Sequence, residues 1–539
     1  GMSVEIAAAE AAAACAWSDF LSNRVRLAVV RAAPFARQLS ELLDERDVPA
    51  ELLVVLADMA YITGAGSGDD PEILALALVA YERFIKLEPP EATINAMRMR
   101  AETLLRLRRY AEAFEAFNTL HAARLRHFVL DDAEVAPFRL IHDAEALEAA
   151  ARLGLPDSDD STAACDLAHR WRQLADELAA VGHGGMSSDA LWQGEDTGQT
   201  MAADSTNSTA APSATLLDTL SMDLRHRVRV RSLSPSQRVL LGLSYGSPLP
   251  IPLGTARHWE PGMSVLHART DWSVHEARYH SDRCVVIDGI LGEGALKELQ
   301  QYARHGAHFN TMRNGYLGCF PNDGATHPIL LKLTTELTRV MRGVFEPYAL
   351  ALWWFFKYSD AGNAGIGLHA DPAAVNVNIW LTEDDAQLSG GGLLIYDHVP
   401  PLEQPTVAAN HEFASVAAED TLRRKLLAKV AHGDTNGDHV QTRGARQVPY
   451  ACNRAVIFVS DQYHESEPFK FKPGYENRRC NLTLLFGDRW SLPTPGNDVA
   501  PRLASSAASG EQKRHSQAGS TQSTGACSAG SADGWDVFD

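Results

Sequence analysis

RRCNLTLLFG, residues 478–487, has the pattern of a β-strand with two unlike faces. Because side chains alternate along a strand, Arg479, Asn481 and Thr483 share one face, and the opposite face is largely apolar. A row of arginine, asparagine and threonine packs poorly in a core. It suits a pocket for a carboxylate, which a planar guanidinium binds through two parallel hydrogen bonds. We expect Arg479 to anchor this pocket. If the strand register is shifted by one residue, Arg478 is the anchor instead. Alternatively, Arg479 forms a structural ion pair and binds no ligand.

Further short β-type runs lie ahead of this segment, separated by Gly, Asp, Asn and Pro clusters. Two helical stretches stand near the start of the same region, GALKELQQYARH (294–305) and ILLKLTTELTRVMRGVF (329–345). Helices followed by many short strands predict an α+β unit around a β-sandwich or barrel. The expected strands are CVVIDGIL (284–291), ALWWFFKY (351–358), AVNVNIWL (374–381), GLLIYDHV (392–399) and RAVIFVSD (454–461).

The triplet His-x-Asp occurs three times, and its surroundings distinguish the three copies. His369 and Asp371 stand between two predicted strands, where residues two apart can point to the same side. The copy at 280–282 has no strand before it, and the copy at 432–434 lies in a loop without a flanking strand. We therefore expect His369 and Asp371 to be the metal ligands.

A third ligand is predicted at His464, which follows the strand RAVIFVSD. Two histidines and one carboxylate on one face of an iron(II) ion leave three positions open for O₂ and a cosubstrate. His398 is an alternative because it also lies on a predicted strand, and His464 in the polar run HESE is also compatible with a surface histidine. His464 is preferred because Arg479 follows it fifteen residues further on.

Taken together, these motifs resemble the 2-oxoglutarate/iron(II)-dependent oxygenase superfamily over about residues 275–492. The resemblance implies a double-stranded β-helix, which is a jelly-roll sandwich, with iron(II) held by His369, Asp371 and His464. It also implies 2-oxoglutarate and O₂ as cosubstrates, with ascorbate as a candidate reductant. A carboxylate at Asp371 implies hydroxylation, or demethylation through hydroxylation, because halogenating relatives have a small residue at that position.

RRCNLTLLFG resembles the final strand of the AlkB and prolyl-hydroxylase branches. That resemblance implies that Arg479 pairs with the distal carboxylate of 2-oxoglutarate, with Asn481 and Thr483 beside it. Tyr358 matches a tyrosine that hydrogen-bonds the same carboxylate in AlkB-like enzymes. Phe356 stands where that branch has an asparagine, so the chain is not assigned to AlkB proper. Whether Asn376 or Asn378 also reaches the pocket is left open.

Residues 1–182 have the three- and four-residue apolar spacing of helices. Between 73 and 125 two amphipathic helices, with small residues at Ala113 and Ala116, resemble the tetratricopeptide repeat, whose helical hairpins stack into a concave binding surface. A plain helical bundle explains the same pattern. The predicted fold is thus an α+β multidomain chain, with an all-α repeat-like domain before the double-stranded β-helix and its flanking helices.

The remaining segments are assigned from composition. The Gly-, Ser- and Thr-rich stretch 183–215 predicts a flexible linker, 216–274 a connecting segment, and 493–539 a disordered tail. Residues 399–448 form a long insertion between two predicted strands of the oxygenase-like region 275–492. Such an insertion is either a lid over the site or a surface excursion, and the sequence does not choose.

Charge and composition exclude several classes of function. The formal net charge of −19 argues against a basic nucleic-acid footprint. Seven scattered cysteines without a CxxC pair favour a reducing compartment, and no apolar stretch is long enough for a membrane span, so we expect a soluble intracellular protein. The GLSYG motif at 242–246 resembles a serine-hydrolase elbow, but the prolines behind it prevent the required helix.

Three functions agree with these observations. The first is an oxygenase that hydroxylates a protein recruited by the helical region. The second is an oxygenase acting on a small molecule or a modified nucleobase. The third is an inactive helical-repeat scaffold, and the intact set of four site residues, His369, Asp371, His464 and Arg479, argues against it.

Overall fold

The structure is a computed structural model of the 539-residue chain. The predicted linker at 183–215 and tail at 493–539 lie outside the residues that it describes, as do most of the insertion 399–448 and the triplet at 432–434. The described residues are 2–22, 24–43, 48–128, 130, 133–152, 158–181, 228–242, 258–313, 315–358, 365–401, 421–424, 426, 440–442 and 445–489.

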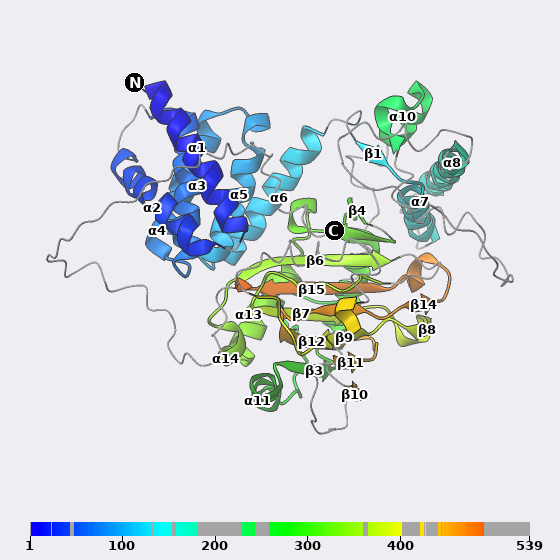
Figure 1. Cartoon of the computed structure of the whole chain (residues 1–539). Coiled ribbons are helices and arrows are strands. Elements are labelled where there is room, and N and C mark those ends of the chain that lie inside the picture. Colours follow the sequence, from blue (N-terminus) through cyan, green and yellow to red (C-terminus); the bar gives the residue numbers. More distant parts are fainter. Residues whose placement is uncertain are drawn as a thin grey trace.

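The N-terminal region is helical, and its first six helices form one layered group (Figure 1). Asp70 begins α4 by accepting hydrogen bonds from the amides of Glu72 and Ile73, with Pro71 at the first helical position. Pro89 and Pro90 follow the end of the same helix. The six helices are α1 (Met2–Leu21), α2 (Val25–Leu42), α3 (Ala50–Gly66), α4 (Pro71–Leu87), α5 (Ile94–Arg106) and α6 (Tyr110–Arg126).

A second helical group consists of α7 (Pro137–Arg152), α8 (Ser158–Val181) and α10 (Pro235–Gly242). Trp171 is fully buried in its apolar core and donates a hydrogen bond to the carbonyl of Leu240. β1 (Glu134–Val135) and β2 (Val228–Arg229) pair beside these helices. Part of the predicted connecting segment 216–274 therefore packs on the N-terminal helices, an arrangement that its composition did not predict.

A seven-stranded antiparallel sheet forms the centre of the molecule (Figure 1). Its central strand β15 lies between β7 and β6, with Thr483 opposite both Asn378 and Trp354. In spatial order the strands are β3 (Cys284–Asp288), β12 (Arg454–Val459), β7 (Val375–Trp380), β15 (Cys480–Phe486), β6 (Leu350–Tyr358), β5 (Tyr316–Cys319) and β4 (Thr311–Arg313).

A smaller antiparallel sheet has the order β10 (Val440–Thr442), β11 (Ala445–Val448), β9 (Leu393–Tyr396) and β13 (His464–Ser466). β8 (Gln387–Gly390) pairs separately with β14 (Phe469–Phe471). An apolar cluster contains side chains from both larger sheets, including Phe458 of β12 and Ile395 of β9. Along the chain, β7 lies in the large sheet, β9 and β11 in the small one, β12 in the large, β13 in the small and β15 in the large. The chain thus crosses repeatedly from one sheet to the other, which is consistent with a jelly roll.

Helices pack against the outer face of the large sheet. They are α11 (Trp272–Asp282), α12 (Glu293–Gln301), α13 (Pro328–Val340) and α14 (Arg342–Phe345). The helix predicted over 329–345 is thus interrupted at Met341, which has φ −126° and ψ 62°. α6 contacts the same outer face, where the ring of Phe114 stacks on Trp353 at 4.7 Å and that of Phe117 meets it edge-on at 5.6 Å.

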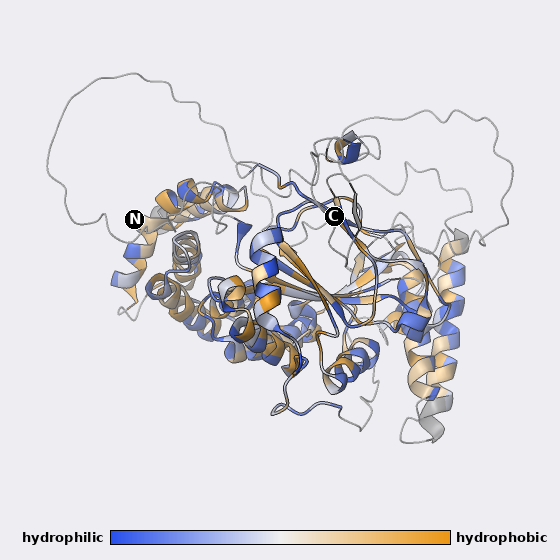
Figure 2. Ribbon diagram, turned by 90° about the horizontal axis from the view of Figure 1, so that it is seen from below, coloured by the Kyte–Doolittle hydropathy of each residue, from blue (hydrophilic) through white to orange (hydrophobic). Residues whose placement is uncertain are grey.

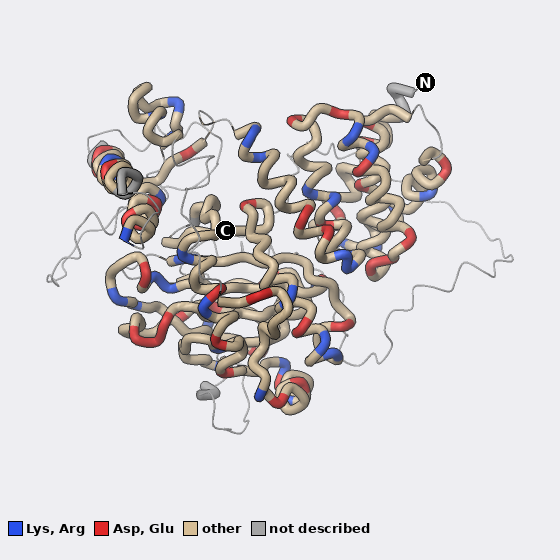
Figure 3. The backbone as a smooth tube through the Cα atoms, turned by 180° about the vertical axis from the view of Figure 1, so that it is seen from behind, with Lys and Arg blue, Asp and Glu red and all other residues tan. Residues whose placement is uncertain are grey.

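The distribution of residue types agrees with these layers. Figure 2 shows hydrophobic residues along the central strands and mixed colouring on the helices around them. Figure 3 shows Lys and Arg interspersed with Asp and Glu along the described backbone. None of the described helices is both long enough and apolar enough to cross a membrane.

Candidate metal centre

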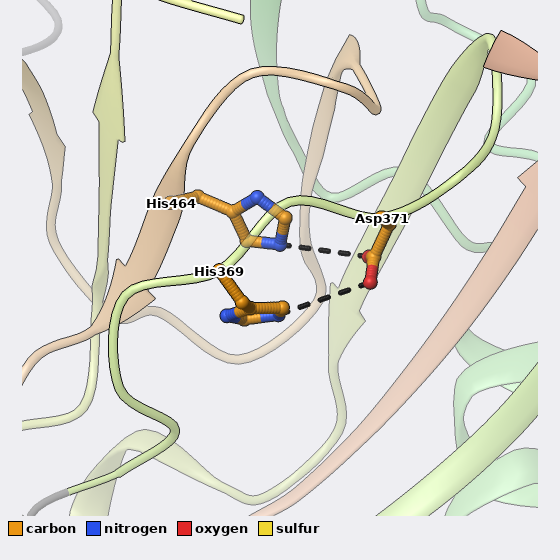
Figure 4. Close-up of side chains that lie close together, drawn as sticks. All are labelled: His369, Asp371 and His464. Carbon is orange, nitrogen blue, oxygen red and sulfur yellow. Dashed lines mark ion pairs between the residues drawn. The ribbon is translucent and has the colours of Figure 1, made fainter. Parts of the chain in front are cut away.

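The side chains of His369 and Asp371, which are two residues apart, meet that of the distant His464 (Figure 4). His369 and His464 form an isolated antiparallel bridge, in which each amide donates to the other's carbonyl at 3.0 and 2.8 Å. Asp371 lies just before β7, with its carboxylate oxygens 3.8 Å from Nε2 of His369 and 3.5 Å from Nε2 of His464. One ligand atom from each residue lies within 4.8 Å of the other two, so the group could hold a metal ion.

Hydrogen bonds orient both imidazoles toward this point. Nδ1 of His369 lies 2.8 Å from the carbonyl of Gly367, and Nδ1 of His464 lies 2.8 Å from that of Gln462. Because a carbonyl oxygen can only accept, each Nδ1 carries a proton, and each Nε2 is directed toward the Asp371 carboxylate. Such partners are typical of histidines that bind metals.

The electrostatics also favour the ligand forms of these groups. Burial and the nearby charge of His464 together lower the pKa of His369 to about 4, although the charge of Asp371 opposes this shift. Burial raises the pKa of Asp371, but the hydrogen bond and charge of His464, the charge of His369 and a hydrogen bond from Asn376 together bring it below its usual value. Near neutral pH the site thus contains a carboxylate and a neutral imidazole, which are the forms that bind metal.

The backbone around the ligands is supported by a buried ion pair that the sequence did not predict. The amide of Asp371 donates to the carbonyl of Ser460 at 3.2 Å. The next residue, Asp461, pairs with Arg489 at 3.0 Å, and both side chains are almost fully buried. Burial raises the pKa of Asp461 to about 7, although the Arg489 charge opposes this shift. The partners are 28 residues apart and carry no common motif, so the sequence offered no signal for the pair.

The polar row on β15 lies along one face of the strand. Arg479 is 2% exposed and donates from Nη1 to Oδ1 of Asn481 at 3.4 Å. Asn481 in turn donates to Oγ1 of Thr483 at 3.1 Å. Nε and Nη2 of Arg479 both donate to the carbonyl of Gly391, at 3.2 and 3.0 Å. The strand period that the sequence predicted is therefore present in the structure.

The charge on Arg479 has no acidic partner among the described residues, although the side chain is buried. The guanidinium instead lies 4.7 Å from the ring of Tyr358 and 5.1 Å from that of Phe469. Burial raises the pKa of the Tyr358 hydroxyl, so this group is neutral near pH 7. Arg478, the alternative anchor, is engaged elsewhere because it forms an ion pair with Glu145 of α7 at 2.7 Å. The second interpretation of Arg479, a structural ion pair, finds no partner in the described part of the chain.

The other residues singled out from the sequence lie apart from this group. His280 is on α11, and the carbonyl of His398 accepts from the amide of Tyr463 without its side chain joining the three ligands. Of the two asparagines left open, Asn376 donates to Oδ2 of Asp371 at 2.9 Å. The Oδ1 atom of Asn378, next to Thr483, is buried without a hydrogen-bond partner among the described residues.

No protein-family model matches the sequence, and no curated protein matches it. Solved structures do match part of the chain. One, from Burkholderia pseudomallei, is described as an oxidoreductase of the 2OG-Fe(II) oxygenase family; it is 11% identical, with a TM-score of 0.27, over 41% of this chain and 94% of that one. AviO1 from Streptomyces viridochromogenes is 17% identical, with a TM-score of 0.27, over 42% of this chain and 100% of its own. HygX from Streptomyces hygroscopicus, with nickel and 2-oxoglutarate bound, is 13% identical, with a TM-score of 0.26, over 40% of this chain and 86% of its own.

Proposed function

We propose that this chain is an iron(II)- and 2-oxoglutarate-dependent oxygenase of the hydroxylating type. The observation that carries the proposal is the combination of two features. One is the group of His369, Asp371 and His464, and the other is the buried guanidinium of Arg479, which has only neutral partners among the described residues. The first feature suits a metal with open positions, and the second suits a carboxylate ligand.

The donor set fits iron(II). Two imidazole nitrogens and one carboxylate on one side of the ion leave the opposite side for a chelating cosubstrate and for O₂. Iron(II), 2-oxoglutarate and O₂ would together supply the chemistry for oxidising a substrate C–H bond, with O₂ as the oxidant. The chain's own part is to orient both Nε2 atoms through Gly367 and Gln462 and to orient the Asp371 carboxylate through Asn376.

The polar row on β15 fits the far carboxylate of 2-oxoglutarate. A buried guanidinium without a counter-charge is costly, and an anionic ligand offsets that cost. Arg479 would supply the charge, with Tyr358 beside its guanidinium and Asn481 and Thr483 along the same strand face. A protein substrate recruited by the helical region stays a prediction.

An anaerobic absorption experiment tests this function. Addition of iron(II) and 2-oxoglutarate to the full chain should give a weak visible charge-transfer band, and admission of O₂ should release succinate. His369→Ala should lose the band, because it removes one of three ligands. His280→Ala is the matched control, since His280 belongs to another His-x-Asp triplet and lies on α11. A wild-type protein with neither the band nor succinate release would contradict the proposal.

A further inference from the structure

Both ends of β15 contact the N-terminal helices through ion pairs. Arg478 stands two residues before Cys480, the first residue of the strand, and Asp488 stands two residues after Phe486, its last residue. Figure 1 shows α5 and α6 near one end of β15 and α7 near the other. β15, which begins directly after the proposed 2-oxoglutarate anchor Arg479, is thus connected at each end to a different helical group.

At the first end, α7 binds the residue next to the anchor. Nε and Nη2 of Arg478 both donate to Oε2 of Glu145, at 3.0 and 2.7 Å. The side chains are 8% and 17% exposed, so solvent screens this pair weakly. Arg478 also donates to the carbonyl of Tyr358 at 3.4 Å, and the amide of Tyr358 donates to the carbonyl of Arg479 at 2.9 Å. These hydrogen bonds therefore fix the position of the Arg479 backbone against the end of β6.

At the second end, the last residue of α5 binds the segment that supports the metal ligands. Nη1 and Nη2 of Arg106 donate to the two carboxylate oxygens of Asp488, at 2.8 and 3.0 Å. The next residue, Arg489, forms the buried pair with Asp461. The residues on either side of Asp461 accept hydrogen bonds from Asp371 and His464, as described above. A short chain of contacts thus connects α5 with two of the three ligands.

We infer that Glu145 and Asp488 are positioning residues, through which the N-terminal helices set the geometry of the two halves of the site. Glu145 acts on the 2-oxoglutarate half through Arg478, and Asp488 acts on the metal half through Arg489 and Asp461. This inference rests on the proposed function. Buried ion pairs often add little net stability. The two pairs at the ends of β15 are therefore better explained by a role in positioning the site than by a role in stabilising the fold.

Two variants of the full chain test the 2-oxoglutarate half and the metal half of the site separately. Glu145→Gln should weaken 2-oxoglutarate binding to the manganese-loaded protein about 10-fold or more, with manganese(II) affinity changed less than about 2-fold. Asp488→Asn should weaken manganese(II) binding by about 10- to 100-fold. Manganese(II) affinity is measured by electron paramagnetic resonance, and 2-oxoglutarate affinity by calorimetry. Such a split is not expected from general destabilisation, which would weaken both.

The matched control is Arg152→Gln. Arg152 of α7 pairs with Glu476 at 2.8 Å, but both side chains are about half exposed or more, at 60% and 49%, and neither lies on β15. This variant should bind both ligands like the wild type. If Glu145→Gln does not fold, Glu145→Asp is measured instead, because it keeps the charge but shortens the reach.

Wild-type affinities in both folded variants would overturn the inference. If the wild-type protein binds neither manganese(II) nor 2-oxoglutarate, the proposed function fails, and hydrogen exchange then decides the inference separately. Amides of β15 should exchange faster in Glu145→Gln than in Arg152→Gln, and equal rates would reject the positioning role.

Discussion

Lys357 on β6 is a buried amine that the site does not use. It is 4% exposed and donates to the hydroxyl of Tyr475 at 2.8 Å. Its ammonium also lies over the rings of Phe309 and Tyr475, at 4.3 and 4.5 Å. No carboxylate of the described residues pairs with it, and burial lowers its pKa to about 7. This residue should therefore make the stability of the fold depend on pH.

The direction follows from proton binding. Between about pH 7 and the ordinary lysine value of 10.5, the unfolded chain holds a proton that the folded chain lacks, so stability rises with pH in this window. Lys357→Met should then raise the free energy of unfolding by about 1–4 kcal/mol at pH 7, with a smaller gain near pH 10. Urea denaturation at both pH values measures this. If Lys357→Met gave the same gain in stability at both pH values, or lowered stability at both, a lowered pKa of Lys357 would be contradicted.

Arg479 gives a second prediction at the scale of one residue. Arg479→Lys keeps the positive charge but loses the planar fork, so the KM for 2-oxoglutarate should rise about 10- to 100-fold, with metal affinity unchanged. Arg342→Lys, on the exposed α14, is the control. The role of Arg479 would be rejected if its variant kept the wild-type KM.

At the scale of elements, the contact between α6 and β6 joins the helical region to the large sheet. Trp353 is fully buried between this helix and the sheet, and its indole donates to the carbonyl of Ala325 at 2.5 Å. The hydroxyl of Tyr110, at the start of α6, accepts from the amide of Leu350 at 3.1 Å. Aromatic contacts and backbone hydrogen bonds thus act together along β6.

Truncation of Phe114 tests this contact. Phe114→Ala should lower the free energy of unfolding by about 3–5 kcal/mol, because it removes a buried ring and leaves a cavity against Trp353. Phe128→Ala is the matched control, because Phe128 is 40% exposed and its truncation should change the free energy of unfolding little. Denaturation followed by circular dichroism compares the two, and similar losses would show that the contact adds nothing specific.

At the scale of the whole molecule, one apolar cluster runs from α5 and α6 into the outer face of the large sheet. It contains Leu104 and Phe117 from the helices together with Trp353, Leu482 and Leu484 from the sheet. The sequence division into residues 1–182 and 275–492 stays a prediction. The shared cluster indicates that the second part needs a cover from the first.

This dependence can be measured on truncated chains. A polypeptide of residues 275–492 should expose the face around Trp353, bind a hydrophobic dye and aggregate, whereas residues 1–492 should stay monodisperse. Light scattering and dye fluorescence compare the two at equal concentration. A monodisperse 275–492 that keeps its metal affinity would show that the sheet does not need the helices.

Local patterns of this protein follow from its amino-acid sequence. Its apolar spacing predicted the helical N-terminal region, and its short β-type runs predicted strands at the positions of β6, β7, β12 and β15. Alternation also placed Arg479, Asn481 and Thr483 on one face, since a strand's period is a property of neighbouring residues. The single helix expected over 329–345 was wrong, because its continuous apolar spacing does not indicate the break at Met341.

Which side chains meet depends on the packing of the folded chain. It placed Glu145 on Arg478, across 333 residues of sequence, and so left Arg479 with its charge unpaired among the described residues. It also brought Asp461 to Arg489 and α6 to Trp353. Such contacts depend on how sheets and helices pack in space, and no periodicity along the chain contains that information.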